Sequence, residues 1–158
     1  MVRLLPDLRR FARFLTGRHD IDDLLQETVT RALAALDQFQ PGTDMRAWVF
    51  AILRNTFYEQ SRRHQTEARA MDRANPPEEA QAPSQVAQME FADLERALQA
   101  LSPLLREALV LVGAHELSYE AAAQICGVPQ GTVKARVSRA RRALAHAMRR
   151  AHVEVEGQ

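Results

Sequence analysis

Apolar residues recur every three or four positions through most of the chain, a spacing typical of amphipathic α-helices. Between Asp20 and Leu36, for example, Leu24, Leu25, Val29 and Leu33 lie on one side of a helix. The same pattern predicts helices over 6–16, from Asp44 to about His64, over 86–101, over 103–114, over a short stretch before Gly127, and onward from about Pro129. No segment alternates apolar and polar residues as a strand would, and Gly is scarce. The sequence therefore predicts an all-α protein.

Helix breakers divide the chain into two parts. Gly17 should end the first helix, Asp20 and Asp44 should cap the second and third, and 37–44 should form a loop around Pro41 and Gly42. The segment 67–85 contains three prolines, few large apolar residues and an excess of acids, which is typical of a flexible acidic linker. We therefore predict two small helical bundles, over 1–66 and 86–150, with a linker at 67–85 and a tail at 151–158.

Positive charge is concentrated in the last predicted helix. Residues 127–150 contain seven cations and no acid, although the net charge of the whole chain is +1. On a helical wheel one arc is apolar: Val133, Val137, Ala140, Leu144, Ala147 and Met148. The opposite arc is small or cationic: Gly131, Lys134, Ala135, Ser138, Arg139 and Arg142. A solvated charged face is the ordinary interpretation, but cations without acids repel one another, and a polyanion would offset that repulsion.

A short helix, a turn at Gly127 and this basic helix make a helix-turn-helix, whose second helix fits the major groove of DNA. Lys134 and Arg139 are the best placed to reach guanine edges, and Ala135 and Ser138 lie between them. The residues expected at phosphates are Tyr119, Thr132, Arg136, Arg141 and Arg142.

Composition excludes several other classes of protein. No apolar run approaches the ~20 residues that cross a bilayer, and the N-terminus does not resemble a signal peptide. The single Cys126 excludes an internal disulfide framework and is expected to pack behind the turn. The five histidines have no paired metal-ligand spacing, and no Ser has an evident His/Asp partner. We therefore expect a cytoplasmic protein that is not an enzyme and holds no metal or cofactor.

Three segments of the chain resemble a known family: "HDIDDLLQETVTRAL", "FQPGTDMRAWVFAILRNTFYEQSRR" and "LSPLLREALVLVGAHELSYEAAAQICGVPQGTVKARVSRARRAL". Together they resemble the extracytoplasmic-function (group 4) sigma factors of bacterial RNA polymerase, most of all the alphaproteobacterial general-stress-response subgroup. The resemblance implies that 1–66 is sigma region 2, which binds core polymerase and opens the −10 element. It implies that 86–150 is sigma region 4, which reads the −35 element, and that an anti-sigma factor holds both domains together.

The resemblance also implies roles for single residues of region 2. Asp23, Gln26 and Glu27 share a helix face and match the positions that bind core polymerase. Phe39 and Asn55 match the residues that hold a flipped −10 base, and we expect Asn55 to be a buried amide that needs partners. Arg54, Arg62 and Arg63 are expected at backbone phosphates.

Several features of region 2 and of the linker also have a simpler structural interpretation. Phe39 could plug the bundle, and Trp48 is better interpreted as core than as a platform for DNA. The acidic linker, with Glu78 and Glu79, could mimic nucleic acid in the polymerase or be a solvated tether.

The sequence is also compatible with two further functions. A sigma-like mimic would sequester an anti-sigma factor without binding promoters, but such a protein is expected to carry a receiver domain, and this chain ends eight residues after its last basic cluster. A stand-alone helix-turn-helix regulator would leave the first bundle unexplained.

Overall fold

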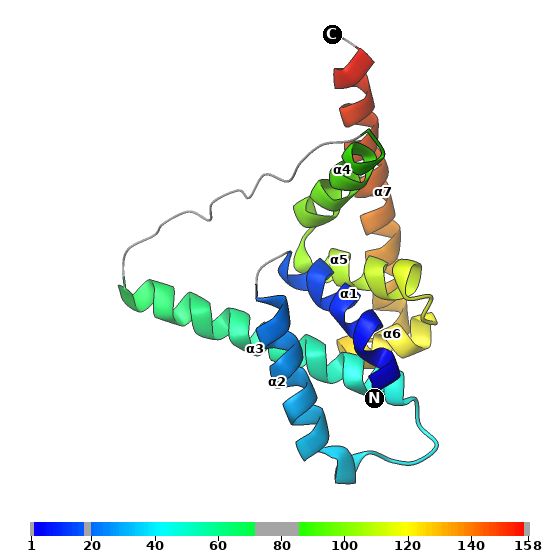
Figure 1. The fold of residues 1–158 in the computed structure, drawn as a ribbon. Helices are drawn as coiled ribbons and strands as arrows, with labels where there is room; N and C mark the ends of the chain where they lie inside the picture. Colours follow the sequence, from blue (N-terminus) through cyan, green and yellow to red (C-terminus); the bar gives the residue numbers. More distant parts are fainter. Residues whose placement is uncertain (1, 18–19, 72–85, 157–158) are drawn as a thin grey trace.

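The computed structural model describes residues 2–17, 20–71 and 86–156, and in these ranges it contains helices and connecting turns but no strand (Figure 1). The elements are η1 (Val2–Leu4), α1 (Leu5–Thr16), α2 (Ile21–Ala34), η2 (Leu36–Gln38), α3 (Met45–Met71), α4 (Val86–Ala100), α5 (Pro103–Leu109), η3 (Val110–Ala114), α6 (Tyr119–Cys126) and α7 (Gln130–Glu156). The predicted all-α class is confirmed. The tail beyond Glu156 and most of the predicted linker, with Glu78 and Glu79, lie outside the described residues.

Helices α1, α2 and α3 form the first bundle. Pro6 lies in the first turn of α1, where its fixed φ favours a helix start, and Gly17, at φ +75°, ends the helix. The apolar stripes of α1 and α2 pack against α3, and Phe11, Leu24 and Phe50 are fully buried between them. This bundle brings the second predicted helix against the third.

The boundaries of α2 and α3 differ from the predicted ones. The Asp20 side chain does not cap α2, because the residue adopts a left-handed backbone at φ +56° instead of the extended conformation of a capping residue. Asp44 does cap α3, since its carboxylate accepts a hydrogen bond of 2.9 Å from the backbone N–H of Arg46. Helix α3 continues to Met71, past the predicted end near His64, and projects beyond the bundle (Figure 1). The first residues of the predicted linker are therefore helical.

The second bundle contains the predicted helix-turn-helix. The Ser118 hydroxyl caps α6 by accepting a hydrogen bond from the N–H of Ala121, and Gly127 ends α6 in the left-handed conformation that favours glycine. On α7 the predicted apolar stripe is confirmed: Val133, Val137 and Ala140 are buried, and Leu144, Ala147 and Met148 are half-buried. The expected helix over 103–114 is α-helical to Leu109 and continues as the π-helical turn η3.

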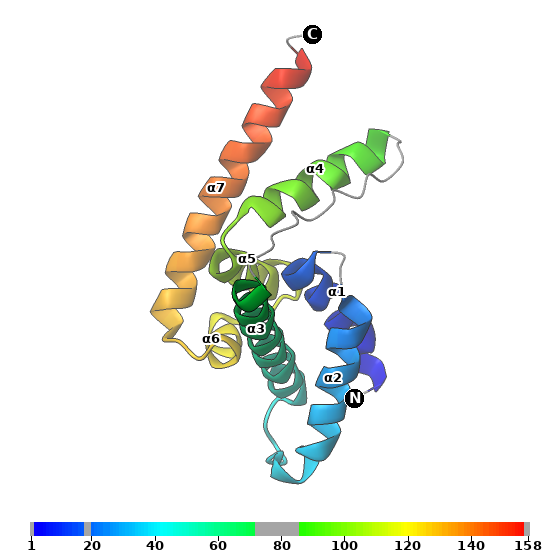
Figure 2. The same cartoon turned by 90° about the vertical axis from the view of Figure 1, so that its left-hand side faces the viewer.

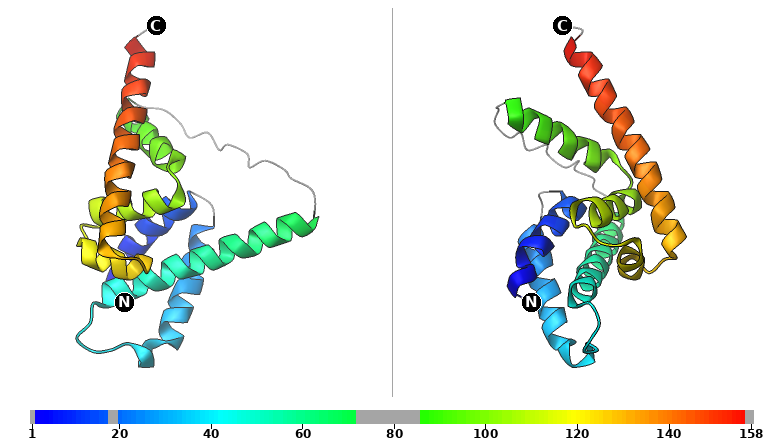
Figure 3. Two further views of the ribbon diagram at one scale, coloured as in Figure 1. Left: turned by 180° about the vertical axis from the view of Figure 1, so that it is seen from behind. Right: turned by 90° about the vertical axis from the view of Figure 1, so that its right-hand side faces the viewer.

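The two bundles pack directly on each other in this structure. Helix α3 contacts α6, and α1 contacts α5, so that one apolar core runs from Phe11 and Phe50 to Leu111 and Ile125. Helices α4 and α7 diverge as they extend away from this shared core (Figure 2; Figure 3). The sequence left open whether the two bundles are docked or apart, and its domain boundaries stay a prediction.

Candidate nucleic-acid interface

The predicted base-reading face of α7 is exposed to solvent. Lys134, Ala135, Ser138 and Arg139 are all exposed, on the side of α7 opposite its buried stripe. The Lys134 ammonium lies 5.6 Å from the centre of the Tyr119 ring, a cation–π contact that links α7 to the start of α6. Arg142 donates a hydrogen bond of 3.3 Å to the Ser138 hydroxyl. The exposed side of α7 thus carries cations and small residues, and the helix has no acid between 130 and 150.

The residues predicted at phosphates are not equally accessible. Arg141 and Arg142 are exposed, and Tyr119 and Thr132 are half-buried. Arg136 is different, because only 14% of its side chain is exposed and its Nη1 lies 3.9 Å from Glu107 Oε1. In this arrangement most of the Arg136 side chain is covered by protein, and its contact with DNA phosphate stays a prediction.

The predicted −10 residues are spread over the loop and α3. The Phe39 ring lies 5.3 Å from the Trp48 ring, and both side chains are half-buried, as the alternative of Phe39 plugging the bundle expects. Asn55 is exposed, so the prediction that it is a buried amide is wrong. It lies two residues, and therefore about 200° around α3, from the buried Leu53. Arg62 and Arg63 are exposed on the projecting part of α3.

Arg54 does not face solvent as a phosphate-binding residue would. Its side chain is 15% exposed, and its guanidinium forms two hydrogen bonds of 3.0 Å to the two oxygens of Glu107 on α5. The Tyr58 hydroxyl donates a further 3.0 Å hydrogen bond to Glu107 Oε2. Burial, followed by the negative charge of Glu107, raises the pKa of Tyr58, so the phenol stays protonated as a donor. In the docked form Arg54 is bound by the second bundle.

The predicted polymerase-binding residues lie together on α2. Asp23 and Gln26 are exposed one turn apart. Glu27 is half-buried and accepts a 2.7 Å hydrogen bond from Arg31, which also pairs with Glu59 of α3 at 2.5 Å. Glu27 is therefore fixed in place by its own bundle, while Asp23 and Gln26 are free to meet a partner protein.

Sequence reasoning missed the polar residues between the two bundles. Glu107 is fully buried, and Arg106 is 8% exposed. Every nitrogen of the Arg106 guanidinium donates to backbone carbonyls: those of Phe14 and Leu15 at the end of α1, and those of Leu98, Gln99 and Leu101 at the end of α4. The only sequence signal is the spacing of Glu107 from the apolar Val110 and Leu111, which places this acid on the buried face of α5.

His115 is a second residue of this interface that the sequence did not single out. Its imidazole is 2% exposed, meets the rings of Phe11 and Phe50 edge-on, and has no hydrogen-bond partner at either nitrogen. Burial lowers the pKa of His115 to about 4. Arg46 of the first bundle donates a 3.0 Å hydrogen bond to the backbone oxygen of His115. A neutral histidine thus packs in the contact between the bundles.

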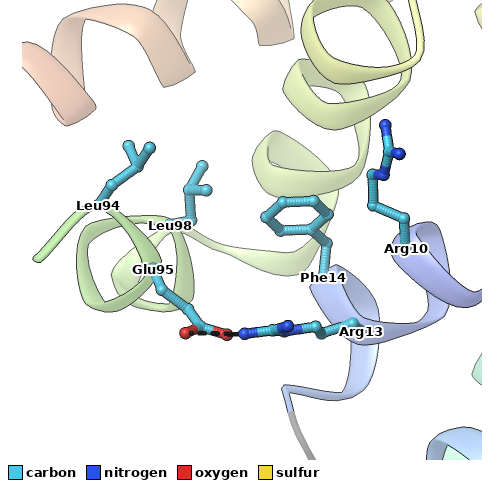
Figure 4. Close-up of a pocket in the computed structure, with 6 residues that line it drawn as sticks. All are labelled: Arg10, Arg13, Phe14, Leu94, Glu95 and Leu98. Atoms are coloured by element: carbon cyan, nitrogen blue, oxygen red, sulfur yellow. Dashed lines mark hydrogen bonds and ion pairs between the residues drawn. The ribbon is translucent and has the colours of Figure 1, made fainter. Parts of the chain in front are cut away.

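A hollow lies at the other end of the interface, between α1 and α4 (Figure 4). Phe14, Leu94 and Leu98 supply apolar lining, and Arg13 pairs with Glu95 across it at 3.1 Å. Arg10 lies beside it on α1. This hollow joins surfaces of both bundles.

The structure offers little support for other chemistry in the part of the chain that it describes. No cluster of three or more His, Cys, Asp or Glu residues there could hold a metal ion. Cys126 is buried as expected, and burial raises the pKa of its thiol to about 12. None of the described helices is long and apolar enough to cross a membrane.

Both bundles match known families. The model of Sigma-70 region 2 matches residues 1–67, and that of Sigma-70, region 4 matches residues 91–144. The fold and the helix-turn-helix thus define a transcription initiation factor of the sigma-70 class.

Similar proteins narrow this class. The chain is 48% identical over 138 residues to the ECF RNA polymerase sigma factor EcfG of Rhodopseudomonas palustris, covering 87% of this chain and 76% of that protein. The chain belongs to the ECF RNA polymerase sigma factors, which confirms the resemblance to the family and to its alphaproteobacterial subgroup.

Two solved structures have the same arrangement of helices. One is the sigma factor RpoE in complex with the anti-sigma factor NepR from Bartonella quintana, at 42% identity and a TM-score of 0.85 over 94% of this chain and 93% of that one. The other is the PhyRSL–NepR complex from Sphingomonas sp. Fr1, at 25% identity and a TM-score of 0.63 over 92% of this chain and 84% of that one.

Proposed function

We propose that this sigma factor binds core RNA polymerase through α2 and recruits it to promoters, with α7 reading the −35 duplex. The observation that carries this proposal is the face of α7 on which Lys134 and Arg139 are exposed to solvent in a helix-turn-helix. Both side chains can donate to guanine O6 and N7 in the major groove. The exposed Asp23 and Gln26 on α2 would meet the polymerase.

The −10 element would be opened by the first bundle. Asn55 is exposed on α3, where its amide could hydrogen-bond a base extruded from the non-template strand. Phe39 packs on Trp48 and would have to leave that contact, or present its exposed edge, to stack on DNA. Arg62 and Arg63 lie farther along α3, where they could follow the phosphate backbone.

We also infer that an anti-sigma factor controls this protein in a stress response. The support is the high similarity to a sigma factor solved with the anti-sigma factor NepR. The hollow between α1 and α4 touches both bundles, so a partner segment bound there would hold them together. This is the docked arrangement in which Arg54 is occupied by Glu107.

Transcription in vitro with bacterial core polymerase tests the proposal. Wild type should direct initiation at a specific promoter, and the double variant Lys134→Ala, Arg139→Ala should lose it. The matched control is Arg149→Ala, Arg150→Ala, which removes two exposed cations from the same helix, farther toward its C-terminal end than the predicted base readers. Equal loss in both double variants would mean that α7 contributes only nonspecific charge.

A sigma-like mimic is the second candidate, because the chain is also similar to PhyRSL in its complex with NepR. A mimic would bind the anti-sigma factor but give no promoter-dependent initiation with core polymerase. A stand-alone helix-turn-helix regulator would instead bind duplex sites tightly without polymerase.

A further inference from the structure

Glu107 is the only fully buried carboxylate among the described residues, and cations from both bundles surround it. Arg54 of α3 forms the two-pronged contact in which each carboxylate oxygen accepts one hydrogen bond at 3.0 Å. Arg136 of α7 lies 3.9 Å away. Glu107 therefore joins region 4, which contains it, to region 2, which supplies Arg54.

The Glu107 carboxylate depends on Arg54 and Tyr58 while it is buried. A charge removed from water is costly unless it is paired and hydrogen-bonded, and here Arg54 and Tyr58 supply three hydrogen bonds. Arg136 is too distant for a hydrogen bond and is in the same bundle as Glu107. If the bundles separate, Glu107 must exchange its partners in region 2 for water.

The same contact occupies the N–H donors of Arg54. A guanidinium pairs with a carboxylate and with a phosphate through the same planar set of N–H donors. While Arg54 holds Glu107, those donors are occupied and 15% of the side chain is exposed. Docking of the two bundles and binding of DNA phosphate by Arg54 are therefore mutually exclusive.

We propose that Glu107 acts as an internal substitute for DNA phosphate, which occupies Arg54 in the docked chain and releases it for −10 DNA when the bundles separate. This inference rests on the proposed function, since it assumes that the Arg54 side of α3 meets promoter DNA. The −35 readers Lys134 and Arg139 stay exposed in the docked chain, so the contact controls the −10 interaction rather than the −35 interaction.

Two variants break the contact between Arg54 and Glu107, and only one of them keeps Arg54. Comparing them distinguishes the effect of releasing Arg54 from the effect of separating the bundles. Glu107→Gln removes the charge that holds Arg54 but keeps the shape of the side chain. Arg54→Ala breaks the contact from the other side and removes the cation itself. Both full-length variants should show a larger radius of gyration than wild type in small-angle X-ray scattering.

Binding to a fluorescent −10 non-template single strand should then differ between the two variants. Glu107→Gln should bind roughly tenfold more tightly than wild type, the gain expected if about nine molecules in ten are docked. Arg54→Ala should show no gain, because it has lost the released cation. Binding to a −35 duplex should change by less than about twofold in Glu107→Gln, since its readers are already exposed.

Glu59→Gln is the matched control for charge. It removes one carboxylate from α3, but Glu59 pairs with Arg31 inside region 2 and touches no residue of region 4 among the contacts described. Its radius of gyration should stay at the wild-type level, because no contact between the two bundles is lost. If Glu107→Gln does not fold, Tyr58→Phe removes one hydrogen bond to Glu107 and should raise −10 binding in the same direction by a smaller factor.

The proposal is overturned if Glu107→Gln, or Tyr58→Phe in its place, leaves −10 binding unchanged. It is also overturned if Arg54→Ala gains as much as Glu107→Gln, because the gain would then come from opening alone. Failure of the proposed function would look different, as wild type would not support promoter-dependent initiation with core polymerase whatever the variants do.

Discussion

The guanidinium of Arg106 on α5 donates a 3.4 Å hydrogen bond to the backbone oxygen of Leu15, 91 residues earlier in the chain. The last carbonyls of a helix have no partner within it, and Arg106 serves those of α1 and α4 together. One side chain thus fastens the end of a helix in region 2 to the end of a helix in region 4.

Arg106→Met should therefore lower the free energy of unfolding by about 3 kcal/mol or more, because it leaves several buried carbonyls without a donor. Urea denaturation measures this change. Arg96→Met is the control: Arg96 is exposed on α4 and pairs only with Asp93 among the described contacts, so its loss should cost less than about 0.5 kcal/mol. Similar losses in both variants would show that the carbonyl contacts of Arg106 add nothing.

His115 should make the stability of the docked protein depend on pH. The pKa of His115 is lowered to about 4 in the folded protein, against 6.5 ordinarily, so the unfolded chain binds more protons between these values. Stability must then fall as the pH falls through this window, by about 2 kcal/mol between pH 7 and pH 5. The charged groups that act on the imidazole are Asp7, which favours its protonated form, and Arg10 and Arg46, which oppose it.

The variant His115→Phe isolates this contribution, because a third aromatic ring can occupy the site between Phe11 and Phe50 without titrating. Denaturation at both pH values should show a smaller loss in the variant than in wild type. Parallel losses in the two proteins would assign the pH dependence to carboxylates elsewhere.

Arg139→Ala should weaken binding to −35 DNA by roughly 1–3 kcal/mol, chiefly at the base position that Arg139 reads. Competition binding with single-base variants of the −35 element measures this. Arg142→Ala, next on the same exposed face, should instead weaken all sequences alike and reduce the dependence on salt. A uniform loss for Arg139→Ala would make that residue a phosphate contact as well.

Asn55→Ala should impair promoter opening and leave −35 binding intact, because its amide is exposed on α3 and the predicted −35 readers lie on α7. Permanganate reactivity of unpaired thymines measures opening, and duplex binding serves as the control for folding. Unchanged opening would remove Asn55 from the −10 site.

Gln26→Ala should weaken the complex with core polymerase without changing stability, because the side chain is exposed on α2. Thr30→Ala, one turn farther along and also exposed, is a comparison on the same helix whose hydroxyl bonds only the backbone oxygen of Gln26 among the described contacts. Titration of labelled sigma factor with core polymerase measures both. Equal affinities for Gln26→Ala and wild type would place the polymerase-binding face elsewhere.

The helices could be predicted from sequence because helical periodicity is a local property. The stripe that contains Val133, Val137 and Ala140 follows from spacing alone, and so does the exposed position of Lys134 and Arg139 on the opposite face. The turn at Gly127 and the cap at Ser118 depend on backbone preferences of single residues. The family motifs indicated that region 2 precedes region 4 along the chain.

The burial and the partners of Arg54, Arg136 and Asn55 could not be predicted, because they depend on which distant surface packs beside each side chain. Arg54 is placed on Glu107, 53 residues later, and nothing in either local sequence pairs the two. The periodicity of α3 could not show that Asn55 would face solvent, because helices of both bundles contact α3 from different sides. Sequence alone determined the helices, the helix-turn-helix and the family, because these follow from local spacing and motifs. Only the tertiary structure decided which polar groups the docked bundles bury, because the cost of burying a charge is set by partners far along the chain.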